Sequence, residues 1–254
     1  MTSTFDVTAT TFDRHRALPR GVAEAIRATI LLAIGKQKAR VLDLGAGTGR
    51  IGKAFVQAND SYVGVDFSLA MLREFAANSR DACLIQADGG QLPFSNRAFD
   101  LVLLMQVLSG AANWLGLLDE ALRVVASSGA IVIGHAATPA SGVDAQLKRR
   151  LAFILEEMGT VVYEPRKSRE QSLAWLEARA ARRAHVTAAT WTAERTPAQF
   201  IARHRTGARF AALPDNVQTE AMRKLAVWAE AAFGSLDTVF AEEHSFGLEI
   251  FEIV

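Results

Sequence analysis

Between residues 40 and 135 the chain alternates short apolar runs with stretches in which apolar residues recur at helical spacing. Five of the short runs are rich in β-branched residues and end at turn residues; they lie at 41–44, 61–65, 82–87, 99–105 and 130–134. Between the last two, Leu115, Leu118, Leu122 and Val125 mark one face of a helix. Nearly continuous apolar strands separated by amphipathic helices are typical of a parallel sheet covered on both faces. The pattern therefore predicts an α/β fold.

The segments that flank this core are predicted to be mainly helical. A stripe of apolar residues from Leu18 to Ile30 predicts a helix before the core. Similar stripes after the core predict further helices up to Phe233. Alternation with period two predicts two late strands. We expect one domain over residues 1–254, with a core at 36–138 and helical cap segments at 1–35, 139–183 and 196–235. The two last strands are expected at 184–195 and 243–254.

Composition narrows the possible partners. The formal net charge is +1, from 28 Lys and Arg against 27 Asp and Glu, so no overall field attracts nucleic acid or an anionic membrane. The single cysteine, Cys83, cannot form an internal disulfide, and no pair of histidines has metal-ligand spacing on one helix face. The sequence shows neither a secretory signal nor an apolar run long enough to cross a membrane. We therefore expect a cytoplasmic protein with no metal, nucleic-acid or membrane partner.

The most informative segment is Val-Leu-Asp-Leu-Gly-Ala-Gly-Thr-Gly-Arg at 41–50, a predicted strand that leads through glycines into a helix. Glycines permit positive φ and close approach of a ligand, and a helix start beyond them offers free N–H groups. Two interpretations compete. Residues 47–52 match the dinucleotide pattern G-x-G-x-x-G, whereas Gly45, Gly47 and Gly49 form an alternating turn preceded by Asp43. A carboxylate beside a diphosphate adds repulsion, but one beside an ammonium or sulfonium group is favourable, so Asp43 supports the second interpretation.

Two further acids follow neighbouring predicted strands. Asp66 closes the second strand, where a carboxylate can accept hydrogen bonds from ribose hydroxyls. Asp88 closes the third and precedes Gly89, a pair that suits the edge of an adenine. Ligands of open α/β sheets bind where such strands end, so these residues are expected to share one site.

Taken in order, segments 43–49, 64–68, 87–88 with 92–94, and 99–100 resemble the motifs of class I S-adenosylmethionine-dependent methyltransferases. Among these, the chain is most similar to the branch resembling the ubiquinone/menaquinone-biosynthesis enzymes. The resemblance covers residues 40–135 and implies a Rossmann-like, seven-stranded, mostly parallel sheet with helices on both faces and a helical cap. This chain differs from the family pattern at 127–129, where Ser-Ser-Gly replaces the usual Pro-Gly-Gly turn before the fifth strand.

The resemblance also implies the roles of the motif residues. Asp43 and the glycine loop would hold the methionine end of S-adenosylmethionine, Asp66 the ribose, and Asp88 with Gly89 the adenine. Phe67, Met71 and Leu92 would supply apolar faces to the base. The expected cofactor-binding set is Asp43, Gly45, Ala46, Gly47, Gly49, Asp66, Phe67, Met71, Ala87, Asp88, Gly89 and Met105.

The implied reaction is methyl transfer to a small-molecule acceptor, with S-adenosylhomocysteine as product; the atom methylated is not assigned. His135 and His15 are the candidate general bases, and five residues are candidates for orienting the acceptor: Arg16, Gln106, Ser109, Asn113 and Tyr163. Many relatives carry a histidine after the fourth strand, where this chain has Met105 and Gln106. Two alternatives stay open: a catalytically silent module that binds S-adenosylmethionine or S-adenosylhomocysteine, and a nicotinamide-dependent oxidoreductase.

Overall fold

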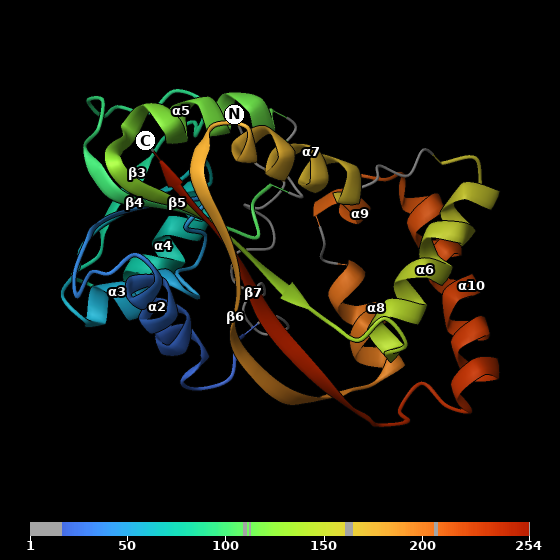
Figure 1. The fold of residues 1–254 in the computed structure, drawn as a ribbon. Coiled ribbons are helices and arrows are strands. Elements are labelled where there is room, and N and C mark those ends of the chain that lie inside the picture. The colour runs from blue at the N-terminus through green and yellow to red at the C-terminus, as the bar shows by residue number, and fades with distance from the viewer. Residues whose placement is uncertain (1–16, 109–110, 112, 161–164, 206–207, 254) are drawn as a thin grey trace. The chain divides into compact units, whose positions relative to one another are not determined.

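The computed structural model describes residues 17–108, 111, 113–160, 165–205 and 208–253 (Figure 1). The chain divides into two compact units. The first comprises Met1–Ala136, Glu164–Ala189 and Phe246–Val254, and the second comprises Ala137–Tyr163 and Thr190–Ser245. Within the described residues, no helix is long and apolar enough to cross a membrane.

A seven-stranded sheet in the order β3-β2-β1-β4-β5-β7-β6 confirms the predicted fold class. Strands β1 to β5 pair in parallel, and Figure 1 shows β7 running in the opposite direction to β5. The strands are β1 (Arg40–Leu44), β2 (Ser61–Asp66), β3 (Cys83–Gln86), β4 (Phe99–Met105), β5 (Val125–Ala137), β6 (Ala180–Arg195) and β7 (Phe240–Ile253).

Helices cover both faces of the sheet in the first unit. They are α2 (Val22–Ala33), α3 (Gly52–Gln57), α4 (Leu69–Asn78), α5 (Trp114–Val124) and α7 (Pro165–Glu177). Connections between parallel strands are right-handed. From β1 the chain adds β2 and β3 on one side of the sheet, and from β4 it adds β5 on the other side. Helices α3 and α4 therefore lie on one face with α2, and α5 lies on the other with α7 (Figure 1).

The face under α5 and α7 holds a large apolar core. Leu118, Ala121 and Val124 line the inner side of α5 at helical spacing, and none of them is exposed. Leu173 and Leu176 of α7 join the same cluster. The predicted cap segment 139–183 is therefore divided, because the apolar side of α7 packs into the sheet unit.

Strand β5 begins earlier than the apolar pattern predicts. Val125, predicted as the end of the helix stripe, already pairs with Phe99, and regular pairing resumes only where Ala130 meets Leu101. The Ser-Ser-Gly segment at 127–129 lies in this irregularity. The segment expected to be a turn is thus an irregular part of β5. The apolar pattern did not predict the first part of this strand because polar residues occupy it.

The second unit has its own helices and its own core. The helices are α6 (Val143–Glu157), α8 (Pro197–Arg205), α9 (Ala208–Ala211) and α10 (Asp215–Phe233). Leu147 and Ile154 of α6 pack with Phe200 of α8 and Leu225 of α10, all of them buried. The periodicity of apolar residues predicted helices in these segments.

Gly49 provides a test of how the first unit is packed. It lies between β1 and α3 with φ of 80°, and a Cβ there would lie 2.3 Å from the buried ring of Phe75. Gly35 has a similar φ of 66° but nothing within 4 Å of its Cβ position. Gly35→Ala should cost about 1–2 kcal/mol from backbone strain alone. Gly49→Ala should cost about 1–3 kcal/mol more because the ring must move.

Urea unfolding of the two variants measures this difference, and Gly35→Ala serves as the matched control. Equal free energies of unfolding would contradict the packing role of Gly49.

Candidate functional site

A cavity of about 600 Å³ lies at the carboxyl ends of the parallel strands in the first unit. The strand order reverses between β1 and β4, since β2 and β3 follow on one side and β5 on the other. Open α/β sheets bind ligands in the crevice at such a reversal. The volume falls within the range of roughly 300–1,000 Å³ that is usual for small-molecule sites.

Most of the expected cofactor-binding residues line this cavity. They are Asp43, Gly45, Ala46, Gly47, Asp66, Phe67, Met71, Ala87, Asp88, Gly89 and Met105. Gln106 and Asn113, two of the candidates for orienting an acceptor, line it as well. Gly49 is not among the lining residues; it makes room for Phe75 instead.

The glycines of the loop have different surroundings. Gly45, with φ of 77°, donates its N–H to the carbonyl of Val65, and a Cβ on it would lie 2.3 Å from Val107. Gly47, with φ of 55°, has no heavy atom near its Cβ position except the carbonyl oxygen of Gly45 at 4.0 Å. Gly47 is therefore the glycine that leaves open space on the cavity side of the loop.

Asp66 ties the glycine loop to the next helix. One carboxylate oxygen accepts the N–H of Gly47 at 2.9 Å, and the other accepts the N–H of Ser68 at 2.8 Å. Ser68 in turn caps α4 by accepting the N–H of Met71. A carboxylate has about four acceptor positions, so Asp66 can hold this corner and still accept from a ligand.

Asp43 is buried beneath the loop. Tyr62 donates its hydroxyl to Asp43 Oδ2 at 2.8 Å, whereas Oδ1 has no hydrogen-bond partner among the described residues. Burial raises the pKa of Asp43 to about 7; the Tyr62 hydrogen bond opposes this shift and the charge of Asp66 adds to it. A cationic group in the cavity would favour the ionised form of Asp43.

The far end of the cavity combines an acid with apolar surface. Asp88 Oδ1 accepts the N–H of Gly90 at 2.9 Å, which shapes the turn after β3. The side chain of Phe67 lines the cavity and is 45% exposed, while Met71 beside it is buried. An exposed aromatic side chain beside an acid and bare glycine backbone suits a flat heterocycle with polar edges.

Arg50 is a lining residue that the sequence analysis missed. Its guanidinium donates to the side-chain carbonyl of Gln106, and this hydrogen bond joins the segment before α3 to the end of β4. Gln106 has φ of 62°, unusual for a residue with a side chain, and donates its N–H to Gly134. The available signal was a cation directly after the glycines at 45–49.

Asn113 lines the cavity and is also the N-cap of α5. Its side-chain oxygen accepts the N–H of Gly116 at 3.0 Å, so it caps the helix. The capping bond fixes the position of this amide at the cavity wall.

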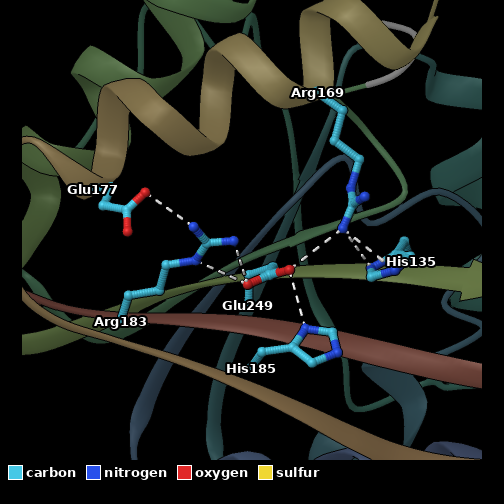
Figure 2. A network of polar contacts seen from close by, with 6 residues as sticks. All are labelled: His135, Arg169, Glu177, Arg183, His185 and Glu249. Carbon is cyan, nitrogen blue, oxygen red and sulfur yellow. Dashed lines mark hydrogen bonds and ion pairs between the residues drawn. The ribbon is translucent and has the colours of Figure 1, made fainter.

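His135 lies in a different polar cluster, shown in Figure 2. It follows Gly134 on β5 and is not among the residues that line the cavity. The guanidinium of Arg169 lies 3.2 and 3.3 Å from its two ring nitrogens, and burial, followed by the charge of Arg169, lowers the pKa of His135.

The centre of this cluster is Glu249 of β7 (Figure 2). Its buried carboxylate accepts from Arg183 and from His185 Nδ1, each at 3.0 Å, and lies 3.6 Å from Arg169. These contacts join β7, β6 and α7. The geometry thus places His135 beside groups that hold α7 on the sheet. The remaining candidates, His15, Arg16, Ser109 and Tyr163, lie outside the described residues.

The arrangement suits an elongated, cationic nucleoside. Acids at β1, at the end of β2 and after β3 line one cavity together with Gly47, and Asp43 Oδ1 is buried with no hydrogen-bond partner in the part of the chain that the structure describes. A diphosphate would face these three carboxylates, which is unfavourable.

Comparison with known proteins agrees with this description. Residues 42–133 match the family model of a methyltransferase domain. A demethylmenaquinone methyltransferase of Corynebacterium urealyticum is 38% identical over 100 residues, which make up 39% of this chain and 43% of that protein. An uncharacterized protein of Methanocaldococcus jannaschii is 35% identical over 123 residues, 48% of this chain and 54% of that protein. The chain therefore spans about half the length of these curated relatives.

Among solved structures, the YcgJ protein of Bacillus subtilis shares the fold. The TM-score is 0.56 at 15% identity, and the match covers 91% of this chain and 99% of that protein.

Asp43→Asn should change how stability depends on pH. The folded protein ionises Asp43 only near pH 7, whereas the unfolded chain ionises it near its ordinary pKa of 3.8. Between these values the folded state binds the extra proton, so this group makes the folded state less stable as pH rises from about 4 to about 7. Asn removes that cost and can still accept from Tyr62. As pH rises from 5 to 8, the free energy of unfolding of the variant should increase relative to that of the wild type by on the order of a few kcal/mol.

Urea unfolding at pH 5 and pH 8 measures the gain. Asp81→Asn, at an exposed acid, controls for the loss of one negative charge. A gain for Asp43→Asn that is the same at both pH values would contradict the buried, raised-pKa carboxyl.

Proposed function

We propose that this chain transfers a methyl group from S-adenosylmethionine to a small-molecule acceptor, and the match of residues 42–133 to the family model of a methyltransferase domain supports this proposal. The observation that carries the proposal is the cavity at the strand reversal. It combines the open side of Gly47, the acid Asp66 and buried Asp43, whose Oδ1 has no partner among the residues that the structure describes.

In this proposal different residues of the cavity bind the ribose, the adenine and the amino-acid end of the cofactor. Asp66 accepts from the ribose hydroxyls while it keeps its bonds to Gly47 and Ser68. Asp88 and Gly89 bind the edge of the adenine, and the exposed ring of Phe67 contacts its face. Asp43 supplies negative charge beneath the loop, toward the cationic amino-acid end.

When bound there, S-adenosylmethionine would supply an electrophilic methyl group: a lone pair of the acceptor would form the new bond to carbon, and the sulfur would keep the electron pair of the broken carbon–sulfur bond. The chain contributes placement and exclusion of water, which favour an in-line displacement. Asn113, fixed at the cavity wall by its helix-capping bond, is a suitable contact for the acceptor. No histidine is among the described residues that line this cavity. A general base is needed only for an acceptor that must lose a proton.

The acceptor is proposed at the level of a small molecule. The similarity to demethylmenaquinone methyltransferases supports methyl transfer, but the matched residues 42–133 include the cofactor cavity and not the second unit. We expect the chain outside this match to select the acceptor, because lids and inserted segments commonly complete such sites.

Two measurements test the function. Calorimetry should detect binding of S-adenosylmethionine but not of NAD, and incubation with cofactor labelled in the methyl group should label a compound in a metabolite extract. Binding without any transfer would favour a silent binding module. Binding of NAD alone would support an oxidoreductase and contradict the proposal.

Gly47→Val tests the position of the cofactor. The branched side chain would fill the open side of the loop, so binding of S-adenosylmethionine should fall by at least about 100-fold while the chain stays folded by circular dichroism. Gly35→Val carries comparable positive-φ strain with open space around it, and it should bind like the wild type. Retained affinity in Gly47→Val would mean that the loop only forms a turn.

A further inference from the structure

A second cavity, of about 470 Å³, lies wholly within the second unit, between α8 and α10. Its volume also falls within the range of roughly 300–1,000 Å³ that is usual for small-molecule sites. The proposed function uses the cavity of the first unit and gives no role to this one.

One face of each helix forms the walls of this cavity. On α8 the lining residues recur at intervals of three or four from Ala198 to Arg205, which is the spacing of a single helix face. On α10 the same spacing runs from Thr219 to Ala226. The cavity is therefore a groove between two helix faces, and from Ala198 to Arg205 it extends for about 10 Å.

The floor of the groove is apolar, and its walls are built from small side chains. Ile201 and Met222 lie deepest among the lining residues, with 8% and 1% of their surface exposed. Three alanines line the walls: Ala198, Ala202 and Ala226. Because an alanine side chain ends at Cβ, these positions leave space that a larger residue would fill. An apolar ligand in this space would remove the floor from water, which is favourable.

The two helices run in opposite directions, and this gives the groove two different ends. The N–H of Ala198 donates to the carbonyl of Leu236 at 2.9 Å, so the start of α8 lies beside the segment that follows α10. Leu236 lines the groove at this end. Arg205, the last residue of α8, and Thr219, near the start of α10, therefore lie at the other end. One end of the groove is apolar and the other is polar.

The polar part of the groove is cationic. Its guanidinium groups belong to Arg205 and Arg223, and no acid is among the described lining residues. Arg223 is already ion-paired with Glu220 at 2.7 Å, one turn earlier on α10. Arg205 is exposed and makes no ion pair in the part of the chain that the structure describes. A guanidinium presents its donors in a flat fork that matches a carboxylate, so Arg205 is the available partner for an anionic group.

From this geometry we propose that the groove between α8 and α10 binds a small amphiphilic carboxylate, such as a medium-chain fatty acid. Its apolar chain lies along Ile201 and Met222, and its carboxylate pairs with Arg205. One guanidinium without an ion pair suits a single negative charge, which favours a carboxylate over a doubly charged phosphate. The site lies within the second unit, so it is a second binding site that goes beyond the proposed function and does not depend on it.

Calorimetry with octanoate and octanol tests the charge of the site, because the two ligands share an apolar chain and differ in their head group. The wild type should bind octanoate at least about tenfold more tightly than octanol. Arg205→Gln should weaken binding of octanoate by about tenfold and that of octanol by less than about threefold, since only octanoate offers a partner to the guanidinium. Arg20→Gln, at an exposed arginine of the first unit, should bind both ligands like the wild type.

Ala202→Trp tests the groove itself. The indole would fill the space between the helices, so binding of octanoate should fall by at least about tenfold while circular dichroism stays unchanged. Ala231→Trp places the same side chain at an exposed position of α10 outside the groove and should bind like the wild type. If thermal unfolding shows Ala202→Trp to be unfolded, the smaller change Ala202→Leu decides, and it should weaken binding by at least about threefold.

Four results would overturn the inference. The folded wild type could fail to bind octanoate at millimolar concentration, or the folded variants of Ala202 and Arg205 could bind it like the wild type. Displacement of octanoate by saturating S-adenosylhomocysteine would place it in the cavity of the first unit instead. A wild-type dimer in sedimentation velocity that Ala202→Trp dissociates would make the groove an interface between two copies of the chain. None of these results bears on methyl transfer, which is measured separately.

Discussion

The carboxylate of Asp66 holds together two of the segments that line the cavity. By accepting the N–H groups of Gly47 and Ser68, it fixes the loop after β1 against the turn after β2. Backbone N–H groups in such turns have few other partners, and a carboxylate acceptor makes the bonds stronger than neutral ones. The open side of Gly47 and the start of α4 keep their places because this one side chain bridges them.

That bridge has an electrostatic consequence. It places a second carboxylate near Asp43, which is buried beneath the same loop, and the charge of Asp66 contributes to the raised pKa of Asp43. Two acids at one corner lower the stability of the folded chain when both are ionised. A cationic ligand relieves this repulsion, so the arrangement that costs stability also favours binding of such a ligand. Strain of this kind concentrates at functional sites.

The sequence predicted the sheet and the acids because these depend on local patterns. Apolar runs mark strands, and the acids that follow them must meet at one edge of a parallel sheet. Arg50 and Gln106 were harder to assign as a pair, because their contact joins residues 56 positions apart and depends on the order in which β1 and β4 lie. The early start of β5 could not be predicted either, because its first part contains polar residues and forms a strand through pairing with β4, which outweighs local propensity.

His135 shows the limit of reasoning from position alone. A histidine after the fifth strand is expected near the ligand, because parallel strands bring their carboxyl ends to one edge. Here β7 and β6 continue the sheet beyond β5, and α7 covers that part. Glu249 attracts Arg169, and Arg169 engages the ring of His135 (Figure 2). Gly134, the residue before His135, instead contributes to the cavity wall, because its carbonyl accepts the N–H of Gln106. Adjacent residues on one strand thus take part in different networks, because successive side chains and carbonyls point in different directions.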